Sequence, residues 1–339
     1  MVPALVVADA LRADGHEVVF AGGQRAEAEL VPASGYELRT LNVEGIDRRN
    51  PVKAARAVAK AAAALGTARK LLRSERPDVV MGGGGYVAGP VGAAAVAARI
   101  PLVLTEADSH LGLTNRSLAR FSKRVCLAFP IAGRDDGRYL VTGRPVPPPV
   151  SDRAAARARF GLAEDDTCVL VFGGSLGARS INEAAIRAFA GASFRVLHAS
   201  GARDYPSLQE QIGSPPPANY DLREYITPFG DALAACALCV ARAGGSIFEI
   251  AAYGRPAVLI PYPYAAADHQ TSNAEWMRRA GAALVMPDAE LTPEQLAREV
   301  GGLLGDRVRL SSMGRASAKL ARPDAAQAIA GEIVAAAQR

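Results

Sequence analysis

The sequence is poor in aromatic residues and cysteines, and it contains no long apolar run. Aromatic residues make up 6% of its 339 residues, and no apolar run approaches the roughly 18 residues that a membrane-spanning helix needs. The first residues also lack the charged, apolar and small-residue order of a signal peptide. We therefore expect neither a transmembrane helix nor a cleaved leader.

The four cysteines are too few for a disulfide scaffold in so long a chain, which indicates a reducing compartment. Cys236 and Cys239 would end a helix and start a buried strand, where nothing stabilises a thiolate. No second pair supplies the four ligands of a structural zinc site. We interpret both as small buried side chains and expect neither a metal nor a cofactor. His16 and His198 have no partner pattern and are predicted to be structural.

Positive charge is concentrated in the first half of the chain. Residues 1–145 carry 20 Lys and Arg against 14 Asp and Glu, a net charge of +6, and the remainder has a net charge of −1. This asymmetry indicates an anionic surface or ligand on one side, although a solvated helix face would also explain each single run. The basic stretch 48–76 has no aromatic residues to stack on bases, which argues against nucleic acid.

Both halves alternate short apolar strands with amphipathic or alanine-rich helices. Half of the residues are hydrophobic, and at roughly 100–200 residues per domain the length suggests two domains. Strands that alternate with helices form parallel sheets covered on both faces, so the predicted class is α/β with two doubly wound domains. The predicted strands are 18–20, 78–81, 101–104, 168–172, 195–198, 238–241 and 257–260, and the predicted helices are 2–13, 52–72, 180–189, 246–253 and 325–337.

The proline-rich stretch Gly143–Val150 separates the two predicted domains, because consecutive prolines continue neither a helix nor a central strand. A second break at Arg322–Pro323 precedes the final helix. The helix that opens the chain has no strand before it, although a doubly wound domain normally begins with one.

The strongest local motif is a buried strand that runs into Gly173, Gly174, Ser175 and Gly177 and then into a helix. Glycines let the backbone approach a ligand closely, and the free N–H groups of a first helical turn attract phosphate. The spacing is neither the Walker pattern nor G-x-G-x-x-G. A tight strand-to-helix turn without a ligand is the alternative interpretation.

A second glycine turn, Gly244-Gly245-Ser246, also lies between a predicted strand and a predicted helix. Glu249 falls within that helix, where its carboxylate can accept hydrogen bonds from two sugar hydroxyls. Two such turns in one domain suit a nucleoside diphosphate better than a single phosphate. The polar stretch Asp268–Asn273 follows another strand, at the end where open α/β sheets place ligands.

In the first half, four successive glycines, Gly82–Gly85, follow a strand. They carry a large entropic cost for a mere connector, which favours close approach of a diphosphate. Glu106, Asp108 and His110 follow the next strand, and each is a candidate general base. A helix cap or a turn former is the alternative interpretation of each.

Together these motifs resemble the MurG family of bacterial N-acetylglucosaminyltransferases, in glycosyltransferase family 28. Five strings carry the resemblance in order along nearly the whole chain: GGGGYVAGP (82–90), LTEADSHLGLTN (104–115), FGGSLGARSIN (172–182), RAGGSIFEIAAYGRPAVLIPYP (242–263) and DHQTSNA (268–274). The resemblance implies a GT-B fold, with two doubly wound domains that face a cleft. It implies an N-terminal domain 1–146 joined by the last helix 325–339, and a UDP-GlcNAc-binding domain 147–324.

The resemblance also implies roles for individual residues. Ser175 matches the serine that contacts the donor diphosphate, Ile226 the residue whose backbone reads uracil, and Gln270 the glutamine that contacts the sugar. Glu249, within the loop and helix 244–249, matches the ribose-binding glutamate. The further substrate-binding positions implied are Gly244, Gly245, Ser246, Ile247, Phe248, Asp108, Arg144, Asn115 and Asn182, and the acceptor-diphosphate loop is Gly82, Gly83, Gly84, Gly85 and Tyr86.

The implied reaction is transfer of GlcNAc from UDP-GlcNAc to lipid I, undecaprenyl-diphospho-MurNAc-pentapeptide, with inversion, to give lipid II. The implied location is the cytoplasmic face of the cell membrane, where a basic domain rests on anionic lipid. We expect direct displacement without a metal, with Asp108 or Glu106 as the base. A transferase that acts on another lipid, such as diacylglycerol, and a non-catalytic UDP-sugar-binding or membrane-scaffold protein remain alternatives.

The sequence departs from the family pattern at three places. Asp108 stands where the family has Asn, and Pro147 stands where it has Arg, for which Arg144 is a candidate replacement. The family's first strand and its GGTxGH loop, with a histidine near the reacting hydroxyl, would precede Met1. Either the start codon lies further upstream or the chain is naturally short and weakly catalytic. We favour the first explanation, because the donor-site motifs downstream are kept.

Overall fold

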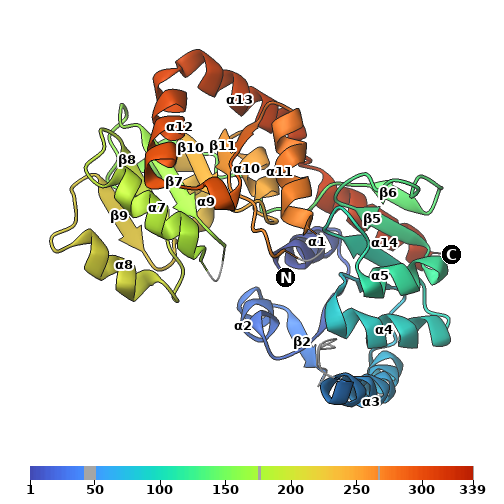
Figure 1. Cartoon of the computed structure of the whole chain (residues 1–339). Coiled ribbons are helices and arrows are strands. Elements are labelled where there is room, and N and C mark those ends of the chain that lie inside the picture. Colours follow the sequence, from blue (N-terminus) through green and yellow to red (C-terminus); the bar gives the residue numbers. More distant parts are fainter. Residues whose placement is uncertain (42–50, 175–176, 266–267, 339) are drawn as a thin grey trace. The chain divides into compact units, whose positions relative to one another are not determined.

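The computed structural model describes residues 1–41, 51–174, 177–265 and 268–338, with side chains for all of these except residues 51–62. Within it the chain forms two compact units, which are described separately (Figure 1). Unit 1 comprises Met1–Pro147 and Arg322–Arg339, and unit 2 comprises Pro148–Ala321.

Unit 1 contains six strands in two parallel sheets among its described residues. One sheet has the order β1-β2 and the other the order β3-β4-β5-β6. The strands are β1 (Val19–Gly22), β2 (Glu37–Thr40), β3 (Val80–Gly82), β4 (Leu102–Glu106), β5 (Arg124–Leu127) and β6 (Tyr139–Val141). The helices are α1 (Val2–Ala13), α2 (Ala26–Ala33), α3 (Pro51–Glu75), α4 (Gly85–Ala97), α5 (Leu113–Leu118), the 3₁₀ helix η1 (Ala119–Phe121) and α14 (Ala325–Ala337).

The four-stranded sheet of unit 1 is covered on both faces. Successive strand side chains point to opposite faces, so Val103 packs with α1 and α14, and Leu102 and Leu104 pack with α3, α4 and α5. Figure 1 shows α1 and α14 side by side, although they lie at opposite ends of the sequence. The last helix therefore belongs to the core of unit 1.

Unit 2 is built on one parallel six-stranded sheet with the order β12-β11-β10-β7-β8-β9. The strands are β7 (Cys168–Phe172), β8 (Arg195–Ala199), β9 (Tyr220–Arg223), β10 (Leu238–Ala241), β11 (Ala257–Leu259) and β12 (Ala283–Val285). The helices are α6 (Arg153–Arg159), α7 (Arg179–Phe189), α8 (Tyr205–Ile212), α9 (Phe229–Ala235), α10 (Ile247–Ala252), α11 (His269–Arg279), η3 (Asp288–Glu290), α12 (Pro293–Gly305) and α13 (Arg307–Leu320).

Helix starts in unit 2 follow from local chemistry. Asp152, Thr292 and Asp306 each precede a helix and accept a hydrogen bond from a backbone N–H of its first turn, as N-cap residues do. On one face of the sheet, Val169 and Val171 pack against α7 and α12. On the other face, α9 packs against β7 and α6.

The prediction of an α/β fold with two doubly wound domains is confirmed. The predicted bounds of β7, β10, α1 and α14 are matched at both ends, and α3 extends beyond the predicted 52–72 to Pro51–Glu75. The strand predicted at 18–20 lies at Val19–Gly22. Five strands were not predicted: β2, β5, β6, β9 and β12. β2 and β9 lie at sheet edges, and their residues do not form an apolar run. β5 is an inner strand that is largely buried.

Candidate functional site

The order of strands in unit 2 marks one place for a ligand. From β7 the chain proceeds to β8 and β9 on one side, and it then returns to β10, β11 and β12 on the other. In an open α/β sheet, ligands bind outside the carboxyl ends of the strands where the order reverses. Here that point lies between β7 and β10, which are hydrogen-bonded neighbours. The two glycine turns of the sequence follow these two strands.

The first glycine turn packs tightly against its surroundings. A Cβ on Gly173 would lie 2.4 Å from the backbone N of Ala178, and a Cβ on Gly177 would lie 2.1 Å from the carbonyl oxygen of Ser200. Gly177 also has a φ of +73°, which favours glycine. Both positions therefore require glycine, and α7 begins directly after the turn. Ser175, the predicted diphosphate contact, lies outside the described residues.

The second glycine turn leads into α10 and is held by α11. Asn273 Nδ2 donates to the carbonyl oxygen of Ala243 at 3.0 Å. Gly244, Gly245 and Ser246 are partly exposed, so their backbone groups are accessible. The predicted contacts Ile247 and Phe248 follow this turn and have buried side chains. Glu249 is partly exposed.

Glu249 and Gln270 lie on α10 and α11, the two helices that adjoin the second glycine turn. Glu249 falls in the first turn of α10. Gln270, on α11, accepts a hydrogen bond from the backbone N–H of Tyr262 through Oε1 at 3.0 Å. This fixes the orientation of the amide and leaves Nε2 3.9 Å from the position of a Cβ on Gly244. The Gln270 donor group is therefore directed toward the second glycine turn.

Ile226, the predicted uracil contact, is buried in the connection between β9 and α9. The start of α9 lies beside the end of β7, because the rings of Phe229 and Phe172 meet edge to face with centroids 5.0 Å apart. The segment between β9 and α9 therefore runs from the edge strand β9 back to the end of β7, where the first glycine turn begins.

Arg242 was not among the predicted site residues, although it joins several loops at this edge of the sheet. Its buried guanidinium donates to the carbonyl oxygens of Ile260 and Pro261, to Ser180 Oγ at the start of α7, and to the carboxylate of Asp288. A charged residue directly after a fully buried strand was the available sequence signal. Its partners could not be read from the sequence, because they come from separate segments.

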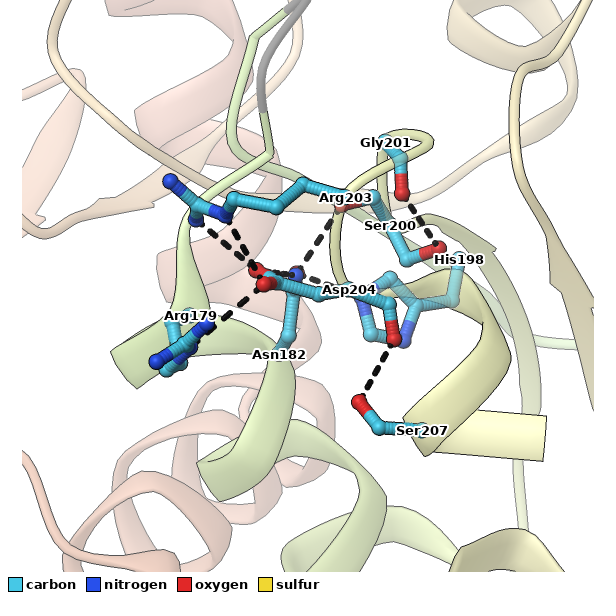
Figure 2. Close-up of polar contacts among 8 residues, drawn as sticks. All are labelled: Arg179, Asn182, His198, Ser200, Gly201, Arg203, Asp204 and Ser207. Atoms are coloured by element: carbon cyan, nitrogen blue, oxygen red, sulfur yellow. Dashed lines mark hydrogen bonds and ion pairs between the residues drawn. The ribbon is translucent and has the colours of Figure 1, made fainter. Parts of the chain in front are cut away.

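A polar network supports the first glycine turn from the β8 side (Figure 2). Asn182 Nδ2 donates to the carbonyl oxygen of Ser200 at 3.0 Å and to Asp204 Oδ2 at 3.1 Å. Its Oδ1 faces His198 Nε2 at 3.0 Å, and His198 Nδ1 faces the Tyr220 hydroxyl at 2.8 Å. Since Asn182 Oδ1 can only accept, His198 carries its proton on Nε2, and its Nδ1 accepts from Tyr220. Asn182 thus lies in the predicted region, in a supporting position.

His198 is fully buried, and burial lowers its pKa to about 3. The imidazole is therefore neutral at physiological pH, as the network requires. The prediction that His198 is structural agrees with this environment. The cysteine prediction is also confirmed, because Cys236 and Cys239 are buried free thiols.

In unit 1 the glycine stretch ends β3 and begins α4. Gly84 and Gly85 have φ values of +78° and +77°, a conformation that side-chain-bearing residues rarely adopt. The Tyr86 hydroxyl lies 3.4 Å from Glu27 Oε1, which also accepts from the backbone N–H of Gly23 at 2.8 Å. The turn therefore presents the start of a 13-residue helix beside the loop after β1.

Glu106 organises the segment that follows β4. Its carboxylate accepts from the backbone N–H groups of Asp108 at 3.2 Å and Gly112 at 2.8 Å, and from Asn115 Nδ2 at 2.9 Å. Asn115 Nδ2 also donates to the carbonyl oxygen of Thr105 at 2.9 Å. Asn115 Oδ1 is buried without a partner among the described residues. Glu106 is thus engaged on both oxygens, as a residue that shapes a loop would be.

Asp108 differs from Glu106. It is half-buried, and no hydrogen bond to its carboxylate is present within the part of the chain that the structure describes. His110 is half-buried on the same segment. Arg144 and Glu106 both line a small cavity of about 30 Å³ under α1 and α14. The carboxyl edge of this sheet therefore gathers Glu106, Asp108 and Arg144.

Two family models match the chain. The glycosyltransferase family 28 N-terminal domain matches residues 1–127, and the glycosyltransferase family 28 C-terminal domain matches residues 168–329. Two relatives carry the name UDP-N-acetylglucosamine–N-acetylmuramyl-(pentapeptide) pyrophosphoryl-undecaprenol N-acetylglucosamine transferase. The protein from Moorella thermoacetica is 40% identical over 96% of this chain and 93% of its own length. The protein from Halorhodospira halophila is 39% identical over 97% and 92%.

Solved structures agree with these matches. The crystal structure of MurG from Acinetobacter baumannii is similar with a TM-score of 0.76 and 28% identity, over 98% of this chain and 95% of that one. The calicheamicin glycosyltransferase CalG4 has a TM-score of 0.69 and 21% identity, over 99% and 95%. The second likeness concerns the fold alone.

The buried His198 predicts an acid-sensitive stability. Its pKa of about 3 lies below the ordinary value of 6.5, so as the pH falls below 6.5 the unfolded chain binds a proton that the native state does not. Stability is present above 6.5 and is lost toward pH 3, by up to about 1.4 kcal/mol per pH unit. Urea unfolding between pH 7 and 5 should show a flatter pH dependence for His198→Gln than for the wild type. The exposed His16→Gln is the control, and equal slopes for all three proteins would contradict the assignment.

Proposed function

The chain belongs to glycosyltransferase family 28, in its MurG group, and we propose that it transfers N-acetylglucosamine from UDP-N-acetylglucosamine to N-acetylmuramyl-(pentapeptide) pyrophosphoryl-undecaprenol. The observation that carries this function is the pair of glycine turns on either side of the strand reversal in unit 2. They offer backbone N–H groups at the starts of two helices, which suit the two phosphates of a sugar nucleotide.

Unit 2 holds the donor in this proposal. The turns after β7 and β10 bind the pyrophosphate, with Ser175 as an added contact. Glu249 accepts hydrogen bonds from the ribose hydroxyls, and the backbone of Ile226 contacts the uracil. Gln270 contacts the donor sugar. This role is supported by the orientation of its amide, which the Tyr262 N–H group holds with Nε2 directed toward Gly244.

Unit 1 holds the acceptor. The start of α4 and the glycines before it bind the pyrophosphate of the lipid-linked sugar, with Tyr86 beside them. The positive φ values of Gly84 and Gly85 support this assignment. Glycine adopts this conformation readily, and because it has no side chain a phosphate can approach the backbone N–H groups closely. Asn115 stabilises the turn from below, since its Nδ2 lies 3.6 Å from the position of a Cβ on Gly84.

The chemistry is a direct displacement with inversion. The C4 hydroxyl of the N-acetylmuramyl residue attacks the anomeric carbon of the donor sugar, and the bond from that carbon to the β-phosphate oxygen breaks. A base takes the hydroxyl proton, and UDP leaves with its charge stabilised by the helix starts of unit 2. Asp108 is the better of the two candidate bases, because the carboxylate of Glu106 is occupied by three donors.

The location follows from the lipid acceptor. Leu113 and Phe121 expose 59% and 50% of their surface on α5 and η1, and Arg116, Arg120 and Lys123 are exposed on the same segment. Exposed apolar side chains with basic residues on the same segment suit an anionic lipid surface. Thr114 Oγ1 donates to the carbonyl oxygen of Gly85 at 2.9 Å, which ties this patch to the acceptor turn. This patch supports a peripheral association with the membrane, and we propose the cytoplasmic face, as the family resemblance implies.

No helix in the described ranges is long and apolar enough to cross a bilayer.

The donor site predicts a defined loss on mutation. Glu249→Ala removes charged hydrogen bonds to two ribose hydroxyls, worth about 1.5–3 kcal/mol each, and should raise the KM for UDP-N-acetylglucosamine at least about tenfold. Transfer of labelled sugar to an undecaprenyl-linked acceptor analogue measures this, with diacylglycerol as the rival acceptor. Glu183→Ala, exposed on α7, is the matched control. Transfer to diacylglycerol alone, or binding of the donor without turnover, would contradict the proposed function.

The two carboxylates of unit 1 predict different outcomes. Asp108→Ala removes the proposed base without introducing the Asn that the family has at this position, and it should lower kcat about 10²- to 10⁴-fold, with loss of the acidic limb of the pH profile. Glu106→Gln places an amide N–H group against the three donors and should lower the free energy of unfolding by about 1–3 kcal/mol, measured by thermal unfolding. An Asp108→Ala variant that keeps the wild-type kcat and pH profile would exclude Asp108 as the base.

The exposed patch predicts a loss of lipid binding. Leu113→Ser combined with Phe121→Ser removes two side chains, each worth about 1.5–3 kcal/mol when buried, and should weaken binding to vesicles containing anionic lipid at least about tenfold. Val308→Ser, 80% exposed in unit 2, serves as the control. Unchanged co-sedimentation of the double variant would show that another surface meets the membrane.

A further inference from the structure

Two arginines meet at one buried carboxylate beside the first glycine turn. Arg203 donates to Asp204 through Nε and Nη2, each at 2.9 Å, and Arg179 donates to Asp204 Oδ1 through Nε at 3.4 Å. The side chain of Asp204 is only 3% exposed, whereas those of Arg179 and Arg203 are 67% and 53% exposed. Figure 2 shows both guanidiniums converging on the Asp204 carboxylate.

Asp204 is not used as a helix cap, although it stands at the N-cap position of α8. An aspartate there normally accepts a hydrogen bond from its own helix. Its carboxylate instead accepts from Asn182 Nδ2 and from the two arginines. One carboxylate between two guanidiniums leaves one net positive charge at the carboxyl edge of the sheet.

The free hydrogen-bonding groups of the two arginines lie on the solvent side. Arg203 uses Nε and Nη2 on Asp204, so Nη1 remains; Arg179 uses Nε alone, so both Nη groups remain. Within the described residues, these Nη groups have no hydrogen-bond partner. Arginine presents such donors in a fork that matches phosphate oxygens.

The arginines stand next to the place where the donor pyrophosphate is proposed to bind. Arg179 is the first residue of α7, directly after the first glycine turn. Asn182 Nδ2, which bonds Asp204, lies 3.4 Å from the position of a Cβ on Gly177.

We propose that Arg179 and Arg203 bind the pyrophosphate of the donor from the β8 side, and that Asp204 is the positioning residue that holds them there. The inference rests on the proposed function, because it assumes a uridine diphosphate at the glycine turns. The two turns then supply backbone N–H groups, and the arginines supply the charge that offsets the departing UDP.

Calorimetric titration of the whole chain with UDP, UMP and uridine tests the arginines. The Arg179→Ala/Arg203→Ala double variant should weaken UDP binding at least about tenfold and change uridine binding less than about twofold, because uridine carries no phosphate. Arg187→Ala, exposed near the far end of α7, is the matched control. Equal losses for UDP and uridine, or no loss for either, would overturn the assignment. A wild-type chain that binds none of the three would overturn the proposed donor as well.

Asp204→Asn tests the positioning role. This substitution removes a negative charge. If Asp204 only neutralised the two arginines, the variant would therefore bind UDP more tightly. A positioning role predicts a lower ratio of UDP affinity to uridine affinity, as in Arg203→Ala. Far-ultraviolet circular dichroism confirms that each variant is folded before titration. A ratio that stays at the wild-type value or rises would exclude Asp204 as the positioning residue.

Discussion

The site in unit 2 depends on the parallel pairing of β7 with β10. These strands are separated by more than sixty residues in the chain, yet Leu238 pairs with Val169 and Ala241 with Phe172. The pairing brings two strand ends to the same edge of the sheet, so the glycine turns that follow them lie side by side. Several proposed donor contacts use this adjacency: the helix starts for the phosphates, Glu249 on the helix after one turn, and Arg179 directly after the other.

Both units stabilise their glycine turns with the same chemical arrangement. In unit 1, Asn115 Nδ2 is shared between the carbonyl oxygen of Thr105 and the carboxylate of Glu106. In unit 2, Asn182 Nδ2 is shared between the carbonyl oxygen of Ser200 and the carboxylate of Asp204. A buried amide satisfied by a carbonyl and a carboxylate resists rotation. Each turn is therefore supported from below by an asparagine that need not touch the ligand.

The sequence analysis identified which segments carry the chemistry, but it did not separate contact residues from supporting ones. Glu106 was chosen as a polar residue after a strand end and Asn182 from the family resemblance, and the structure shows both engaged in networks within their own unit. Arg203 and Asp204 were not chosen, because nothing in the local pattern distinguishes them from surface charges. Arg242 was not chosen either, although it directly follows a fully buried strand. Their partners come from separate loops, and only folding reveals that Asp204 is buried while its arginines stay exposed.

The sequence by itself determined the α/β class, the buried strands and the glycine turns, because apolar periodicity and the steric freedom of glycine are local properties. It also determined the family, since five motifs recur in order along the chain. The family resemblance had assigned the last helix to the N-terminal domain, and in the structure residues 325–337 pack into the core of unit 1. The tertiary structure alone decided that unit 1 has two sheets among its described residues, and that Asn182, His198 and Tyr220 form one directed chain of hydrogen bonds. These depend on contacts between residues far apart in sequence, whose spacing carries no local signal.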